Sequence, residues 1–270
     1  MKSLLTAQSQ GTPLFIFEQN EPFESWLADQ IPFTQNWLKQ ISFSGSGLAL
    51  IPNEQGELSQ ALYIVENASH FFACGDLIKK LPAGQYLLHA EPEHRQAICF
   101  AWLIGTYDYT RYVTKKQNKP QLPVLAVNDQ ALVDSAIKYA QATTLVRDLV
   151  NTPAADMMPK NLGDSAQQLA DNFGGKLTQI IGDDLLTKNY PTIHAVGRAS
   201  VNEPRLIDLS WGSADHPKIT LVGKGVCFDS GGLDLKPAAG MRNMKKDMGG
   251  SAHVLGLAQL IMSHNLPINL

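Results

Sequence analysis

The sequence predicts an α/β fold, in which an N-terminal α/β domain is joined by a long helix to the first part of a second α/β domain with a mixed, helix-covered sheet. Short apolar runs alternate with helical patterns along the chain, which is typical of α/β proteins. One long helical pattern, 129–151, separates the two halves. The composition, 44% hydrophobic and 17% charged over 270 residues, is that of a globular chain. We therefore expect an N-terminal domain at 1–128, a connecting helix at 129–151 and a second, incomplete domain at 152–270.

The N-terminal half reads as strands and helices in alternation. Apolar runs that are rich in β-branched and aromatic residues predict strands at 13–19, 47–52, 61–66 and 85–90. Helical spacing of apolar residues predicts helices at 34–41, 71–81 and 94–112. The segment 115–129 carries two prolines and a polar run, which favours a domain boundary there. Asn128 or Asp129 is then placed to cap the long helix.

The second half begins with a helix at 161–173, which Gly174 and Gly175 end. Nearly continuous apolar runs predict strands of a sheet covered on both faces at 176–182, 192–197, 205–211 and 218–223. A helix at 251–264 is apolar almost all round, which predicts that it is buried. A further strand begins at 266–270, where the sequence stops, so we expect the chain to be the N-terminal part of a longer protein.

The charge pattern, the cysteine content and the lack of long apolar stretches argue against several classes of protein. The net charge of −3 comes from interspersed signs, and basic runs such as Lys115-Lys116 and Lys245-Lys246 are only two residues long, which argues against nucleic-acid binding. Three widely spaced cysteines without a Cys-x-x-Cys pair argue against a disulfide framework and favour a reducing, cytoplasmic compartment. No export signal and no apolar stretch long enough to span a membrane is present in the sequence.

The stretch 223–250, "GKGVCFDSGGLDLKPAAGMRNMKKDMGG", has the strongest functional pattern. Lys224 follows an apolar run and lies between two glycines, where backbone and ligand can approach closely. Asp229 follows five residues later, and Asp247 stands just before the apolar helix. Taken singly, a lysine is usually a solvated surface charge and an aspartate before a helix is usually an N-cap. Together they supply two carboxylates and an amine around one expected strand end.

Such a set suits divalent cations. Oxygen ligands combined with nitrogen suit Mn²⁺ or Zn²⁺, and a carboxylate between two cations can bridge a two-metal site. Lys224 can act as a ligand only as a neutral amine, a form that a nearby dication favours. Lys236 can stay charged and stabilise an oxyanion.

Other interpretations of these residues are weaker. A phosphate-binding P-loop is absent, because G-x-x-x-x-G-K-[ST] does not occur. Cys227 lacks an assigned base as a nucleophile and reads as a small buried hydrophobe. His194 and His253 stand in no metal-binding pattern, and core or supporting roles explain them. Met244 and Met248 read as packing residues, with Met244 the better candidate to line a pocket.

The sequence resembles the leucyl aminopeptidases, also called cytosol aminopeptidases, of the M17 metallopeptidase class. The resemblance runs from about Leu145 to the end of the sequence and rests above all on one long motif. The matching segments are "LVRDLVNTPAADMMP" (145–159), "IIGDDLL" (180–186), "IHAVGRAS" (193–200), "RLIDLSW" (205–211) and "VGKGVCFDSGGLDLKPAAGMRNMKKDMGGSA" (222–252). The second domain is then the first part of an α/β metallo-aminopeptidase catalytic domain, and an α/β domain is implied before it.

The resemblance implies a role for each residue of the motif. Lys224 is similar to a ligand of the more readily exchanged metal, Asp229 to the carboxylate shared by both metals, and Asp247 to a second ligand of the exchangeable one. Lys236 is similar to the catalytic lysine that polarises the scissile carbonyl, and Met244 to a residue lining the substrate side-chain pocket. The implied reaction is removal of the N-terminal residue, preferably leucine or another apolar residue, from peptides by a water that two metals activate.

One departure from the family pattern limits this expectation. The family's second motif, N-T-D-A-E-G-R, supplies further metal ligands and the arginine that holds a bicarbonate, and it does not occur in this sequence. We therefore expect these 270 residues to be inactive by themselves. The alternatives are a non-catalytic relative that keeps the fold as a binding or structural protein, and a fragment that acts as a binding or oligomerisation module. Some relatives of the family bind DNA besides cleaving peptides. The resemblance also implies a cytoplasmic homo-oligomer, a hexamer, that acts on peptides with a free N-terminus.

Overall fold

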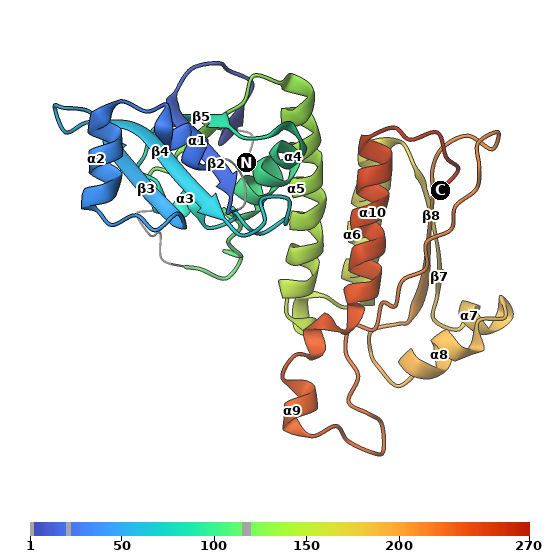
Figure 1. Cartoon of the computed structure of the whole chain (residues 1–270). Helices are drawn as coiled ribbons and strands as arrows, with labels where there is room; N and C mark the ends of the chain where they lie inside the picture. Colours follow the sequence, from blue (N-terminus) through green and yellow to red (C-terminus); the bar gives the residue numbers. More distant parts are fainter. Residues whose placement is uncertain (1–2, 20–22, 115–119) are drawn as a thin grey trace. The chain divides into compact units, whose positions relative to one another are not determined.

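The computed structural model describes residues 3–19, 23–114 and 120–270 (Figure 1). The chain forms two compact units, residues 1–140 and 141–270, and the division falls inside the long helix α5 (Gln130–Asn151). The α/β fold class expected from the sequence is confirmed.

The first unit is built on a six-stranded sheet with the order β1-β6-β5-β2-β4-β3. All neighbouring strands run parallel except β3, which pairs antiparallel with β4. The strands are β1 (Leu5–Thr6), β2 (Thr12–Glu18), β3 (Gly47–Pro52), β4 (Leu58–Val65), β5 (Gln85–His89) and β6 (Val124–Ala126). The helices are α1 (Phe23–Ala28), α2 (Pro32–Gln40), α3 (Leu77–Lys80), α4 (Pro92–Ile104) and the first half of α5.

Apolar side chains cover both faces of this sheet. On β2, Leu14 and Ile16 belong to the larger core, while Phe15 and Phe17 pack against a second core under α1 and α2. This alternation follows from the two-residue period of a strand. Trp102 on α4 is fully buried in the larger core, and its indole Nε1 donates a hydrogen bond to the Leu4 carbonyl at 2.8 Å. Both faces of the sheet are therefore packed.

Two helices predicted in this unit are shorter in the structure. The helix expected at 71–81 is reduced to α3, and turns precede it. The helix expected at 94–112 ends at Ile104, with Gly105 as its C-cap, and Gly105 packs so closely against the Gly75 carbonyl that no side chain fits there. The segment 115–129, predicted as a domain boundary, contains β6, a strand of the sheet, while 115–119 lies outside the described residues.

The second unit contains one antiparallel strand pair, β7 (Lys176–Ile181) with β8 (Arg205–Ser210), in which Lys176 lies opposite Ser210. Its helices are the second half of α5, η1 (Ala154–Asp156), α6 (Pro159–Phe173), α7 (Asp184–Thr187), α8 (Pro191–Gly197), α9 (Ala238–Met241), η2 (Met244–Met248) and α10 (Gly249–Ser263). Figure 1 shows α6 and α10 alongside the strand pair, and α6 contacts both strands. Trp211 follows β8, and its indole Nε1 donates to the Phe173 carbonyl at 3.1 Å.

Three segments predicted as strands differ in this unit. The segment 192–197 is helical and belongs to α8, which Pro191 begins. The segment 218–223 is extended, but Lys218 makes only an isolated parallel bridge to Asn269. Leu270, from the predicted strand at 266–270, exchanges two backbone hydrogen bonds with Trp211. The sheet is therefore continued by single pairings rather than by full strands.

The expected burial of the apolar segments was also partly wrong. Exposed and half-buried residues alternate at the start of β7 and at the end of β8, where Lys176 lies opposite Ser210. These strands are therefore not covered on both faces. Helix α10 buries Ala252, Leu255, Ala258 and Met262, whereas Leu257 is 48% exposed. The apolar sequence of α10 therefore has one covered side and one open side. Among the described residues, no helix has the length and apolar character needed to cross a membrane.

Candidate metal-binding and catalytic site

The glycine-rich stretch 223–250 packs closely against the start of α10. A Cβ atom on Gly223 would lie 2.6 Å from the Gly250 carbonyl oxygen and 2.7 Å from the Ser251 Cα. The Ser251 hydroxyl donates to the Gly223 carbonyl at 2.9 Å, and the Ser251 amide donates to the Lys224 carbonyl at 2.8 Å. The glycines are thus needed for close backbone approach, and Ser251 holds Lys224 in place.

Lys224 and Asp247 come together from the two ends of this stretch. The Lys224 Nζ donates to the Asp247 Oδ1 at 3.0 Å. The lysine side chain is 62% exposed and the aspartate side chain 22% exposed. The pair joins residues 23 positions apart in sequence. Asp247, in η2 just before α10, therefore directs its carboxylate to Lys224.

Asp229 and Lys236 form a second pair within the loop. The Lys236 Nζ donates to the Asp229 Oδ2 at 2.7 Å, and the Gly231 amide donates to the Oδ1 of the same carboxylate at 2.8 Å. Gly231 and Gly232 have φ angles of +94° and +75°, in the left-handed region that favours glycine. The turn at these glycines brings Lys236 back to Asp229, and the Lys236 amide donates to the Ser230 carbonyl at 2.9 Å.

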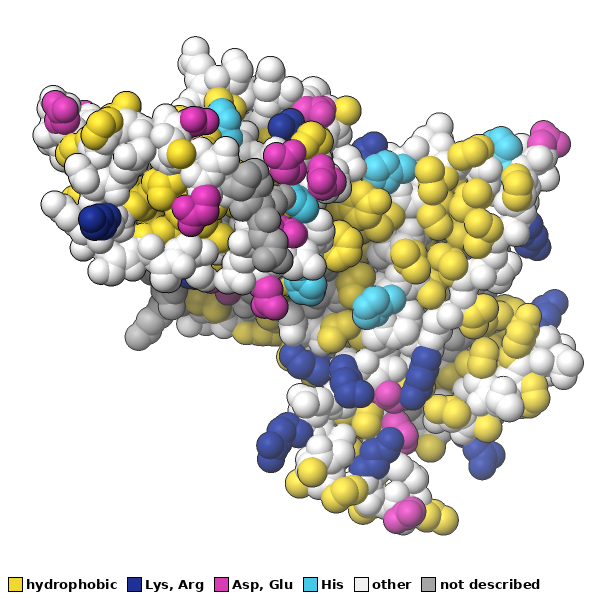
Figure 2. All heavy atoms as spheres, in the orientation of Figure 1, with side chains coloured by type: hydrophobic (Ala, Val, Ile, Leu, Met, Phe, Trp, Pro, Cys, Tyr) yellow, Lys and Arg dark blue, Asp and Glu magenta, His cyan; other side chains and the backbone are white. Residues whose placement is uncertain are grey.

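The charges of the two pairs act on each other. The Lys236 hydrogen bond, followed by that of the Gly231 amide, holds the pKa of the Asp229 carboxyl below its usual value. The Lys224 charge lowers this pKa further. Asp229 is therefore ionised at neutral pH, beside two lysines. Figure 2 shows lysine and arginine side chains gathered beside acidic ones in the part of the second unit that carries α9.

The other residues singled out in the sequence lie outside the two lysine–aspartate pairs. Met244 is 9% exposed and lies in η2, within the stretch 223–250. Cys227 is buried, as predicted, and burial raises the pKa of its thiol to about 11. The His194 Nε2 lies 3.0 Å from the Asp183 Oδ1. His253 is exposed on α10 rather than in the core, and its Nδ1 lies 2.7 Å from the Gly249 carbonyl oxygen.

Sequence reasoning missed two supporting residues. Ser251 holds the backbone of Lys224, and Asn151 accepts a hydrogen bond from the Lys245 Nζ at its Oδ1, at 3.3 Å. The first could have been found from the repeated glycines at 223 and 250, which indicate a close approach next to a serine. The second could not, because residues 94 positions apart carry no local pattern.

The donor set fits part of a two-metal centre. Two carboxylates and an amine gather at one loop, and ammonium groups lie 2.7 Å and 3.0 Å from the carboxylate oxygens, where a cation would also be favoured. Across residues 3–19, 23–114 and 120–270, no group of three or more histidine, cysteine, aspartate or glutamate side chains could hold a metal ion. The described residues therefore bring together two carboxylates and an amine at this loop, without a third acidic, histidine or cysteine side chain beside them.

Comparison with known proteins identifies both halves of the chain. Residues 12–125 match the N-terminal domain of M17 aminopeptidases, and residues 144–270 match the catalytic domain of the cytosol aminopeptidase family. The two matches thus define the class, the M17 aminopeptidase family, with an N-terminal domain followed by a catalytic domain. The chain belongs to the cytosol aminopeptidase family.

The relatives agree with this assignment. A cytosol aminopeptidase from Coxiella burnetii has 39% sequence identity and a TM-score of 0.88, over 98% of this chain and 58% of that protein. The bottromycin maturation enzyme BotP in complex with Mn has 25% identity and a TM-score of 0.76, over 96% of this chain and 58% of that one. A probable cytosol aminopeptidase from Roseiflexus castenholzii is 37% identical over 187 residues, which is 64% of this chain and 38% of that relative. The chain thus spans only 38% of this curated relative and 58% of these solved structures.

Proposed function

We propose that this chain supplies part of the active site of a metal-dependent aminopeptidase that removes the N-terminal residue, preferably leucine or another apolar residue, from peptides. The observation that carries this proposal is the pair of lysine–aspartate contacts in the loop 223–250. Membership of the cytosol aminopeptidase family supports the reaction class.

The proposed metal ligands are Lys224, Asp229 and Asp247. Asp229 is the proposed shared ligand. Its two oxygens accept separate hydrogen bonds, from Lys236 and from the Gly231 amide, and a cation would replace a donor at either oxygen. Lys224 would have to release its proton and turn from Asp247 to act as a ligand. Bound Mn²⁺ or Zn²⁺ would supply Lewis acidity and lower the pKa of a water molecule. BotP, whose structure includes Mn, supports Mn²⁺ as a candidate.

Lys236 is proposed as the catalytic residue. Its side chain is 30% exposed, and its Nζ lies 2.7 Å from the Asp229 Oδ2. The Lys236 Nζ can donate a hydrogen bond to the scissile carbonyl oxygen, which becomes negative as the peptide bond is attacked. Met244, which is nearly buried, is proposed to line the pocket for the apolar side chain.

The further expectations remain proposals. A homohexamer in the cytoplasm is consistent with relatives named cytosol aminopeptidases. A bicarbonate would need the arginine of the N-T-D-A-E-G-R motif, which this sequence does not contain. A second function, a binding or oligomerisation module, is favoured by exposed apolar side chains of the second unit, including Val222, Leu235 and Leu257 at 90%, 71% and 48% exposure.

A chimera tests the enzymatic function. Residues 1–270 are joined to the C-terminal part of the Coxiella burnetii relative that they do not match, and the product is loaded with Mn²⁺. We expect release of leucine from leucine p-nitroanilide and from leucyl peptides, and no release from N-acetylated peptides. A folded, metal-loaded chimera that cleaves none of these substrates would falsify the proposed activity. In that case association of the 270-residue chain, measured by sedimentation, would favour the binding module.

A further inference from the structure

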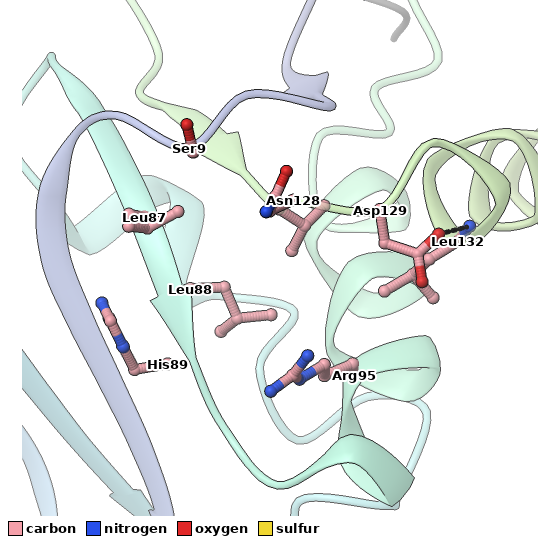
Figure 3. A pocket seen from close by; sticks show the side chains of 9 residues that line it. Ser9, Leu87, Leu88, His89, Arg95, Asn128, Asp129 and Leu132 are labelled. Atoms are coloured by element: carbon pink, nitrogen blue, oxygen red, sulfur yellow. Dashed lines mark hydrogen bonds between the residues drawn. The ribbon is translucent and has the colours of Figure 1, made fainter.

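A pocket of about 220 Å³ lies at one edge of the sheet in the first unit, separate from the loop 223–250. Its walls come from the end of β5, the first turns of α4 and α5, and the segments that follow β1 and β6, as Figure 3 shows. The lining residues are Ser9, Leu87, Leu88, His89, Arg95, Val127, Asn128, Asp129 and Leu132. The strands β5 and β6 run parallel, so both reach this edge with their carboxyl ends.

The strand order reverses next to this pocket, between β2 and β5. After β2 the chain continues to β3 and β4 on one side of β2, whereas after β5, the neighbour of β2 on the other side, it continues to β6. The carboxyl ends of parallel strands are common ligand positions in α/β sheets. The pocket lies at the carboxyl ends of β5 and β6, one strand pair away from the reversal.

Opposite charges stand on different walls of the pocket. The Arg95 Nε donates to the Ala90 carbonyl at 2.9 Å, which directs the guanidinium of this α4 residue toward β5 (Figure 3). Asp129 precedes α5, and its Oδ1 accepts the Leu132 amide at 3.0 Å. The Oδ2 of Asp129 and the terminal nitrogens of Arg95 are the groups that a ligand can engage. The pocket thus pairs a cationic wall with an anionic one.

Between these charges the lining is largely apolar. Leu88 and Val127 are buried, and Leu87 and Leu132 complete the apolar surface. The His89 ring stacks on Phe15, with ring centroids 4.8 Å apart. Partial burial, and then the Arg95 charge, lowers the pKa of His89, so the ring is neutral at neutral pH. Arg95 and Asp129 are therefore the charged groups among the pocket residues.

We propose that this pocket binds a free α-amino acid with an apolar side chain. The α-carboxylate would pair with Arg95, the α-ammonium group with Asp129, and the side chain would lie on the leucines and Val127. A pocket of this size is smaller than the usual site for a drug-sized ligand, which suits a single amino acid. A simple anion such as phosphate would meet the Asp129 carboxylate, and a peptide carries its two end charges too far apart. The site goes beyond the proposed peptidase activity and does not depend on it.

Calorimetric titration of the 270-residue chain with L-leucine, in the presence of EDTA, tests the site. We expect one leucine per chain, and binding at least roughly tenfold weaker for leucinamide, N-acetylleucine and inorganic phosphate, each of which lacks at least one of the required features. Arg95→Gln and Asp129→Asn should each weaken leucine binding roughly tenfold or more. Asparagine caps helices as well as aspartate does, so α5 is kept in the second variant.

Lys39→Gln is the matched control, because it removes one positive charge from the exposed end of α2 outside the pocket. It should bind leucine like the unaltered chain. The proposal is overturned if leucine does not bind, if both pocket variants bind it normally, or if N-acetylleucine or phosphate binds as well as leucine. Because the ligand series uses the unaltered chain, the test holds even if a pocket variant fails to fold. Its result is independent of peptide cleavage by the chimera.

Discussion

Lys224 and Lys236 differ in the exposure of their side chains and in how each reaches its aspartate, although both stand beside glycine or proline in the sequence. Lys236 is 30% exposed and returns to Asp229 within one turn, whereas Lys224 is 62% exposed and reaches Asp247 from the far end of the loop. Lys236 is therefore held by the local turn itself. Lys224 depends on how the two ends of the loop meet at α10.

This difference leads to a prediction for Lys236. In the Mn²⁺-loaded chimera, Lys236→Ala should lower the turnover number by about 10²–10³ and leave metal content nearly unchanged, because its proposed role is to stabilise the developing oxyanion. Asp229→Ala should remove bound metal. Metal analysis of the purified variants beside steady-state kinetics measures both effects. Lys246→Ala, an exposed lysine of the same loop, is the control and should retain full activity. Equal metal loss in the Lys236 and Asp229 variants would make Lys236 a ligand or a structural residue.

Buried acids of the first unit predict a loss of stability at high pH. Burial raises the pKa of the Cys74 and Cys99 thiols to about 12, and that of Tyr63 to about 12, from ordinary values of 9.0 and 10.0. In the unfolded chain these groups ionise first, so the folded state loses stability as the pH rises above 9. Urea unfolding at pH 8 and pH 10, followed by circular dichroism in the presence of a reductant, should show this decrease. A Cys74→Ala/Cys99→Ala protein should show a smaller one, and an equal decrease would contradict the assignment.

The chemical character of the candidate site could be predicted from the sequence, but its pairing could not. The residue types at 224, 229, 236 and 247 indicate carboxylates and amines on glycine-rich backbone. Which lysine meets which aspartate depends on the left-handed glycines after Asp229 and on the close packing at Ser251. No local sequence pattern predicts these two features, or the lysine–aspartate distances that result from them. The metal and catalytic roles of these residues stay predictions.

At the scale of elements, the junction between the loop and α10 is the critical contact. Gly223→Ala should destabilise the second unit by about 1–3 kcal/mol, because the new Cβ would overlap the backbone of Gly250 and Ser251. The control is Gly249→Ala, where the new Cβ would lie 4.0 Å from the Val150 side chain and meet no backbone. Thermal unfolding of both variants measures the difference. Equal stability of the two variants would show that the junction can relax.

The elements themselves could be predicted where the apolar pattern was long or strongly alternating. β2, β3, β5, β7, α6 and α10 lie within a few residues of the predicted segments. The segment 192–197 misled because a short run with β-branched residues fits a strand and a helix equally well, and Pro191 at the first helical position decided the outcome. β1 and β6 are too short to give a pattern, and only their pairing with each other and with β5 makes them strands.

At the scale of the whole molecule, the incomplete ligand set predicts weak metal binding. Residues 1–270 alone should bind Mn²⁺ or Zn²⁺ weakly and should show almost no peptidase activity, because each candidate carboxylate is already paired with a lysine and few further ligands are at hand. Calorimetric titration with each ion, beside a peptidase assay, checks this. An Asp229→Asn/Asp247→Asn protein gives the background from other side chains. Tight binding of two ions per chain would show that these residues already form a complete site.

The buried indole of Trp102 and the half-buried indole of Trp211 give each unit its own optical probe. Trp211 is the one tryptophan in the sequence of residues 141–270, and its hydrogen bond to Phe173 ties the end of β8 to the end of α6. Trp102 has the same function in the first unit, through its bond to Leu4. In a protein with Trp26, Trp37 and Trp102 replaced by phenylalanine, the wavelength of emitted light would report the second unit alone. Unfolding of the second unit, which carries the lysine–carboxylate loop, could then be followed separately from unfolding of the first unit.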